Sequence, residues 1–159
     1  MIKVLFLLLL STLLFSAMKE HTLHPSPQAL HQSGGIKILD AKELQYQAFE
    51  GLDVRELSAI AYKDSILYAL GDKGVLFHFD MEIENKKIKK LSLAKAMKLK
   101  NKDGAVLKKS HRDSEGLCFI ENDLLISFEK KARVDQYSRL GIKIKKQKLQ
   151  IKNSEINLA

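Results

Sequence analysis

The chain has 159 residues, of which 45% are hydrophobic and 29% are charged, so it is not an extended disordered protein and is long enough for one globular domain. Lys and Arg outnumber Asp and Glu by 27 to 19, and the resulting net charge of +8 favours anionic partners such as phosphate esters. The basic residues are not interleaved with aromatic residues as in RNA-reading modules, so nucleic acid is not an expected partner.

The N-terminus has the features of a secretory signal peptide. Lys3 provides a positive start, residues 4–15 are almost all apolar, and the small residues Ser16 and Ala17 follow. The apolar run is shorter than the roughly 20 residues that span a bilayer as a helix. We therefore expect a signal peptide at 1–17 and a secreted or periplasmic protein with no stable membrane span after cleavage. An uncleaved anchor is the alternative, because Phe15 stands where cleavage prefers a small residue.

Residues 18–35 are polar and contain both prolines of the chain and a Gly-Gly pair, which predicts a flexible linker. The linker holds His21, His24 and His31. Their spacing is irregular and no scaffold surrounds them, so a tether is expected here rather than a metal site.

From residue 36 onward, short apolar or alternating runs separated by polar turns predict β-strands. These runs include 56–62, 65–72, 75–80 and 86–93. His78 alternates with apolar residues in the third of them, which predicts an exposed strand histidine. The basic stretch that follows is irregular and predicts one short helix at 93–100.

The strand pattern repeats. A shift of 57 residues places Glu56 on Asp113, Leu67 on Leu124 and Asp72 on Glu129 without a gap. Each unit has an inner strand that is apolar on both faces, which is typical of stacked β-propeller blades. The expected fold is all-β: a partial β-propeller of about two four-stranded antiparallel blades, at about 56–93 and 113–151, joined by a basic excursion at 94–112.

The number of blades predicts an association. Closed propellers have about 4 to 8 blades, and two blades alone would expose apolar sheet faces. We therefore expect either that the chain is a truncated product or that remaining blades or self-association close the ring.

One cysteine, Cys118, cannot form an internal disulfide. It lies among apolar residues, which predicts a buried core thiol rather than a nucleophile.

Carboxylates stand at the ends of equivalent strands in both units. Because adjacent antiparallel strands place the start of one beside the end of the next, these acids should face one rim. The predicted ligands of a calcium ion are Glu56, Asp72, Asp113, Glu115 and Glu129. Lys73, Arg112 and Lys130 flank them and are the predicted phosphate-binding residues, and His111 is the candidate general base. Turn formation and surface ion pairing are the structural alternative for the same acids.

Ser58 is a candidate nucleophile, but no Gly-x-Ser-x-Gly elbow surrounds it.

Two stretches carry a family resemblance over about residues 50–141. The first comprises Leu-Ser-Ala-Ile-Ala-Tyr at 57–62 and Leu-Tyr-Ala-Leu-Gly-Asp-Lys-Gly at 67–74. The second comprises Asp-Ser-Glu-Gly at 113–116 and the run from Leu124 to Glu129. The chain, from 36 to 159, resembles the phytase-like propeller family called "esterase-like activity of phytase". The resemblance implies a phosphoric ester hydrolase that uses calcium on a small phosphorylated substrate. The alternatives are a non-catalytic propeller binding module and an inactive truncated remnant.

Overall fold

The computed structural model describes residues 19–20, 39–44, 46 and 48–147. The predicted signal peptide at 1–17 and most of the predicted linker, with its three histidines, lie outside these residues. Two linker residues are described and form β1 (Lys19–Glu20), which pairs antiparallel with β2 (Lys42–Glu43). Within the described part of the chain, no helix has the length and apolar character needed to cross a membrane.

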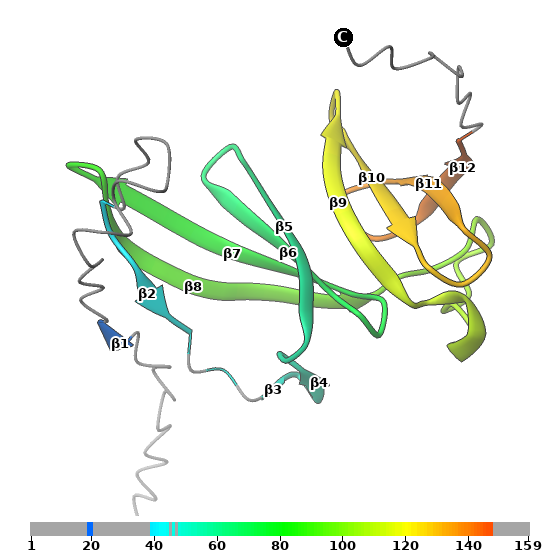
Figure 1. The fold of residues 1–159 in the computed structure, drawn as a ribbon, viewed down its shortest axis with the longest axis horizontal. Coiled ribbons are helices and arrows are strands. Elements are labelled where there is room, and N and C mark those ends of the chain that lie inside the picture. The colour runs from blue at the N-terminus through cyan, green and yellow to red at the C-terminus, as the bar shows by residue number, and fades with distance from the viewer. Residues whose placement is uncertain (1–18, 21–38, 45, 47, 148–159) are drawn as a thin grey trace, which may run out of the picture.

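Two four-stranded antiparallel sheets make up most of the molecule (Figure 1). The first sheet consists of β5 (Leu57–Lys63), β6 (Ile66–Gly71), β7 (Val75–Glu84) and β8 (Lys87–Lys98), paired in that order. The second consists of β9 (Ser114–Ile120), β10 (Asp123–Phe128), β11 (Arg133–Tyr137) and β12 (Lys143–Lys146), also in chain order. The short strands β3 (Ala48–Phe49) and β4 (Leu52–Asp53) pair with each other. The predicted all-β, two-blade architecture is confirmed.

The two sheets repeat each other in detail. β5 and β9, and likewise β6 and β10, begin and end at residues separated by the 57-residue shift. Each first strand carries a β-bulge at the same place, at Ser58 in one sheet and at Glu115 in the other. The first two strands of each sheet therefore pair in the same register with a bulge at the same position, and the sequence repeat is a structural repeat.

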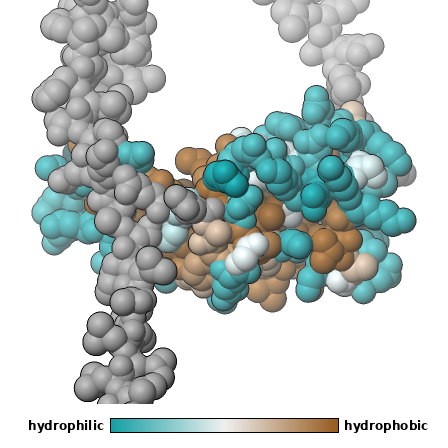
Figure 2. All heavy atoms as spheres, turned by 90° about the horizontal axis from the view of Figure 1, so that it is seen from below, coloured by the Kyte–Doolittle hydropathy of each residue, from teal (hydrophilic) through white to brown (hydrophobic). Residues whose placement is uncertain are grey.

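A shared apolar core lies between the two sheets. Tyr68, Leu70 and Leu76 of the first sheet and Leu124 and Ile126 of the second are almost completely buried in it. Figure 1 shows β5 and β9, the first strands of the two sheets, facing each other at this junction. In the view from below, apolar residues gather across the middle of the molecule and hydrophilic residues lie at its two ends (Figure 2). Burial of these side chains is what holds the blades face to face.

Polar contacts join the turns at the far ends of the first strands. The Lys63 ammonium group donates to the main-chain oxygen of Glu121, and Arg139 forms an ion pair with Asp64 at 2.9 Å. Arg139 also donates from Nε to the main-chain oxygen of Asn122 at 3.0 Å. These contacts hold the two hairpin turns against each other, in addition to the packing between the sheets.

A second core lies on the other face of the first sheet. Phe77, Phe79, Leu91 and Leu93 are buried there, and among the residues that pack against them are Leu44, Tyr46, Phe49 and Leu52. The backbone N–H of Leu93 donates to the hydroxyl of Tyr46 at 3.0 Å, which ties this covering segment to β8.

The prediction of a short helix at 93–100 was wrong. β8 continues to Lys98, because its apolar residues alternate inward and pair with β7, with Leu93 opposite Phe79 and Met97 opposite Leu76. Part of the predicted basic excursion is therefore the outer strand of the first sheet.

The expected exposures of His78 and Cys118 were both wrong. His78 is 6% exposed, because the second sheet covers the face on which it packs against the Tyr68 ring, with centroids 4.6 Å apart. That burial lowers the pKa of His78. Cys118 is exposed, because it points away from the shared core. Alternation along a strand identifies two faces, but only the neighbouring sheet decides which face is covered.

Within the described residues, the repeat shows which apolar face of the first sheet has no blade against it. Leu117 and Phe119 of the second sheet pack against the shared core. Their equivalents in the first sheet are Ile60 and Tyr62, which are 63% and 47% exposed. Ile60 and Tyr62 on β5 are therefore exposed, although the equivalent residues of the second sheet pack against a neighbouring blade. Cys118 lies on the opposite surface, equivalent to Ala61, where a further blade would pack.

We expect these two surfaces to meet between copies of the chain, with the Ile60 face of one copy on the Cys118 face of another. Sedimentation velocity over a concentration series should show reversible association. Ile60→Glu should abolish it, because a carboxylate would be buried without a partner. Leu140→Glu, at a residue 59% exposed in the β11–β12 connection, is the matched control and should associate normally. A wild-type protein that stays monomeric at every concentration would contradict this expectation.

Candidate metal and phosphate site

Three of the five predicted metal ligands lie together at one end of the second sheet. Asp113 precedes β9, Glu115 occupies the bulge of β9, and Glu129 follows β10. Each offers a carboxylate oxygen, and these oxygens all lie within 4.8 Å of one another. The Glu129 N–H donates to the Asp113 carbonyl at 3.1 Å, so the two strand ends are held side by side.

The carboxylate cluster (Asp113, Glu115 and Glu129) is anchored to the first sheet by Ser114. Ser114 is completely buried, and its hydroxyl donates to the Gly71 carbonyl at 2.8 Å. Its N–H donates to the Asp72 carbonyl at 3.3 Å, and its carbonyl accepts from the Ser58 hydroxyl at 2.7 Å. The hydroxyl of Ser58, the candidate nucleophile, is therefore engaged in joining the blades. Sequence reasoning missed Ser114, although it stands between the two acids of the Asp-Ser-Glu motif.

Glu56 and Asp72 are not part of the cluster. The Asp72 N–H donates to the Glu56 carbonyl at 3.0 Å, so their backbones are adjacent, as predicted from the strand pairing. The Glu56 carboxylate forms an ion pair with Lys73 at 2.5 Å, and the hydrogen bond from Lys73 lowers the pKa of Glu56. The equivalent pair in the second repeat is Lys130 with Asp113, at 3.2 Å, so this ion pair is common to both repeats.

A cavity of about 220 Å³ lies beside the first sheet, and four of the side chains that line it are cationic. Lys73 and Arg112, two of the predicted phosphate-binding residues, line it, together with Arg55 and Lys98, which were not predicted. Arg55 pairs with Asp53 at 3.1 Å, whereas Arg112 and Lys98 have no side-chain partner within the described residues. The cavity therefore offers unused cationic donors to an anion.

Gly74 allows Arg112 to lie beside this cavity. Gly74 has a φ of 67°, and a Cβ at this position would come within 2.8 Å of the Arg112 Cβ. The turn between β6 and β7 therefore needs glycine both for its conformation and for the close approach of Arg112.

Asp72 also lines this cavity. Its Oδ1 atom is buried and has no hydrogen-bond partner in the described part of the chain.

The remaining predicted residues lie elsewhere. Lys130 contacts the carboxylate cluster through an ion pair with Asp113 at 3.2 Å and does not line the cationic cavity. His111 is not in the carboxylate cluster and lines a different cavity, beside Lys108 and Arg133. The charge of Lys131, with burial and the charges of Arg133 and Lys108, lowers the pKa of His111 and favours its neutral form.

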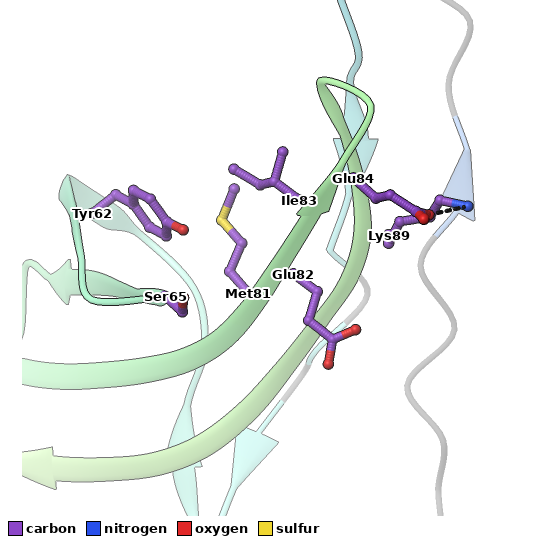
Figure 3. Close-up of a pocket in the computed structure, with 7 residues that line it drawn as sticks. All are labelled: Tyr62, Ser65, Met81, Glu82, Ile83, Glu84 and Lys89. Carbon is purple, nitrogen blue, oxygen red and sulfur yellow. Dashed lines mark ion pairs between the residues drawn. The ribbon is translucent and has the colours of Figure 1, made fainter.

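A larger groove of about 650 Å³ lies at the opposite end of the first sheet (Figure 3). Tyr62 and Ser65 face Met81 and Ile83 across it, and Glu84 forms an ion pair with Lys89 at its edge. The charged residues that line the groove, Glu82, Glu84 and Lys89, are all engaged in ion pairs, so its size alone does not make it the candidate site.

Comparison with known protein families identifies the family of this chain. Residues 39–155 match the family described as "Phytase-like: Esterase-like activity of phytase". The chain belongs to this phytase-like family. No curated protein and no solved structure matches the chain. The resemblance inferred from the sequence is confirmed, and the match covers both sheets of the phytase-like protein, including the cluster and the cationic cavity.

We expect Ser114→Ala to lower the free energy of unfolding of the phytase-like protein by about 1 kcal/mol, because the buried Gly71 carbonyl would lose one of its donors and keep the Gly74 N–H. Urea unfolding measures the effect. Ser127→Ala, in the neighbouring strand and without a side-chain hydrogen bond among the described residues, is the control and should change stability by less than about 0.5 kcal/mol. Equal effects of the two substitutions would show that the Ser114 hydrogen bond has no special weight.

We expect the His111 imidazole to titrate below the ordinary range of histidine, because cationic neighbours disfavour its protonation. NMR titration of its C–H signals, assigned with His111→Gln, gives the pKa. Lys131→Gln removes the largest cause and should raise this pKa, whereas Lys102→Gln, which is not among the causes, should leave it unchanged. A His111 pKa at or above the ordinary value would contradict this account.

Proposed function

We propose that this phytase-like protein is a secreted or periplasmic, calcium-assisted phosphoric ester hydrolase that acts on a small phosphorylated substrate. The observation that carries the proposal is the adjacency of two kinds of charge. Asp113 belongs to the carboxylate cluster and Arg112, the preceding residue, lines the cationic cavity. A metal-binding and a phosphate-binding group are thus supplied by one short segment.

The carboxylate cluster fits a calcium ion by its donor chemistry. Calcium takes about six to eight oxygen ligands, mostly from carboxylates, main-chain carbonyls and water. Asp113, Glu115 and Glu129 supply hard oxygen donors, and Lys130 offsets only part of their negative charge. A bound calcium would hold phosphate oxygens and polarise the phosphorus–oxygen bond or activate water.

The cationic residues would bind and orient the phosphate group. Arg112 can present two parallel N–H donors to phosphate oxygens, and it has no competing carboxylate partner in the described residues. Lys98 is equally unpaired, whereas Lys73 would have to share its ammonium group with Glu56. We therefore assign the main phosphate contacts to Arg112 and Lys98, with Lys73 in a supporting role.

His111 keeps its proposed role as general base on electrostatic grounds. Its lowered pKa leaves the imidazole neutral near pH 7, which is the form that accepts a proton. It lines the neighbouring cavity, one residue from Arg112.

Calcium binding tests the metal part of the proposal by calorimetry. We expect saturable binding below about 1 mM calcium, the range of weak extracellular sites. Glu115→Gln and Glu129→Gln should each weaken it about tenfold or more, because each removes a charged ligand. Glu121→Gln makes the same change in an exposed turn at the other end of the second sheet and should bind normally. Absence of binding at millimolar calcium would eliminate the metal site.

Hydrolysis of a generic phosphodiester, with calcium and with a chelator, tests the activity. Activity should require calcium and fall strongly in Arg112→Gln, with folding checked by circular dichroism. Calcium binding without turnover of any phosphoester would favour the non-catalytic binding module over the hydrolase.

A further inference from the structure

The chain between the two sheets folds against the outer strands of the second one. Lys100 forms β-bridges with both Val106 and Ile142, and the N–H of Lys143 donates to the Lys100 carbonyl at 3.0 Å. The short 3₁₀ turn η1 (Lys109–His111) then leads to β9. This connection and the outer strands line a cavity of about 280 Å³ that is open to solvent and separate from the one that Arg112 lines.

One buried carboxylate and several cations line this second cavity. Asp135 is 1% exposed and forms ion pairs with both Arg133 and Lys143, each at 2.9 Å. A single carboxylate thus faces two cations, and Lys108 adds a third. The wall therefore carries a net positive charge even after the buried carboxylate is neutralised.

Arg133 serves mainly to hold the wall in place. Besides Asp135, its guanidinium donates to the carbonyls of Lys130 and His111, and it lies 3.8 Å from the centre of the Phe128 ring. Its position is therefore fixed by the fold and does not depend on a ligand.

The polar groups of the wall that remain available are mainly donors. Lys108 has no side-chain partner within the described residues. The Asn101 side-chain oxygen accepts from the N–H groups of Asp103 and Ala105, which leaves the NH₂ group of Asn101 for a ligand. Lys143 uses one contact for Asp135 and keeps further N–H donors. A ligand that satisfies this wall must bring acceptors and negative charge.

We propose that this second cavity binds a small oxyanion, namely a phosphate or sulfate group, either free or carried by a small organic molecule. Its volume suits a small group, since sites for drug-sized ligands range from about 300 to 1,000 Å³. The proposal needs neither calcium nor the carboxylate cluster.

Titration with inorganic phosphate in calcium-free buffer, followed by the NMR signals of His111, tests the proposal, because His111 lines this cavity and not the other. We expect the signals to shift saturably in the wild type. Lys108→Gln should weaken binding about tenfold, the equivalent of one charge-assisted contact. Lys109→Gln, the matched control, removes the same charge from an adjacent residue that does not line the cavity and should bind like the wild type.

Two further experiments distinguish a free oxyanion from an organic phosphate, and the second cavity from the first. Sulfate and glycerol phosphate should compete with inorganic phosphate, whereas equal potency of chloride would reduce the effect to ionic strength and overturn the proposal. Equal weakening by Lys108→Gln and Lys109→Gln, or no saturation below about 10 mM phosphate, would also overturn it. If Arg112→Gln abolished the shift and Lys108→Gln did not, phosphate would bind the first cavity. The inference would then be wrong, while the proposed hydrolase would survive.

Discussion

The hydrogen bonds of one buried serine join the two blades at the end where the charged residues gather. Ser114 bonds through its hydroxyl and its N–H to the carbonyls that end β6, and it accepts a hydrogen bond from Ser58 of β5. These bonds lie at the edge of the shared apolar core, where burial makes an unpaired carbonyl costly. Because Asp113 and Glu115 flank Ser114, the position of the carboxylate cluster relative to the first sheet depends on this contact.

Equivalent backbone positions in the two repeats carry side chains of different chemistry. At the bulge of the first strand, the first sheet has Ser58, which links the blades, and the second has Glu115, which joins the carboxylate cluster. Two residues before the bulge, Glu56 pairs with Lys73 and Asp113 pairs with the equivalent Lys130, but Asp113 has two further carboxylates beside it. Both copies therefore supply serines that join the blades, whereas the carboxylate cluster lies in the second copy.

Three consecutive residues define three neighbouring environments at this end of the molecule. His111 lines the cavity of the interblade connection, Arg112 lines the cationic cavity of the first sheet, and Asp113 belongs to the carboxylate cluster. Successive side chains of an extended segment point in different directions, so a short stretch can serve all three. The segment is held from both sides, by Gly74 against Arg112 and by Arg133 on the His111 carbonyl.

The sequence by itself determined most of the strands, apart from the last part of β8. It also determined the equivalence of Glu56 with Asp113 and of Asp72 with Glu129. These properties follow from the alternation of apolar residues and from an ungapped repeat, both of which are local. The tertiary structure decided that Cys118 is exposed and His78 buried, because the covering of a strand face depends on a neighbouring sheet. It also decided that Asp113, Glu115 and Glu129 meet while Glu56 and Asp72 stay outside their cluster, because side-chain direction is set only when the blades pack.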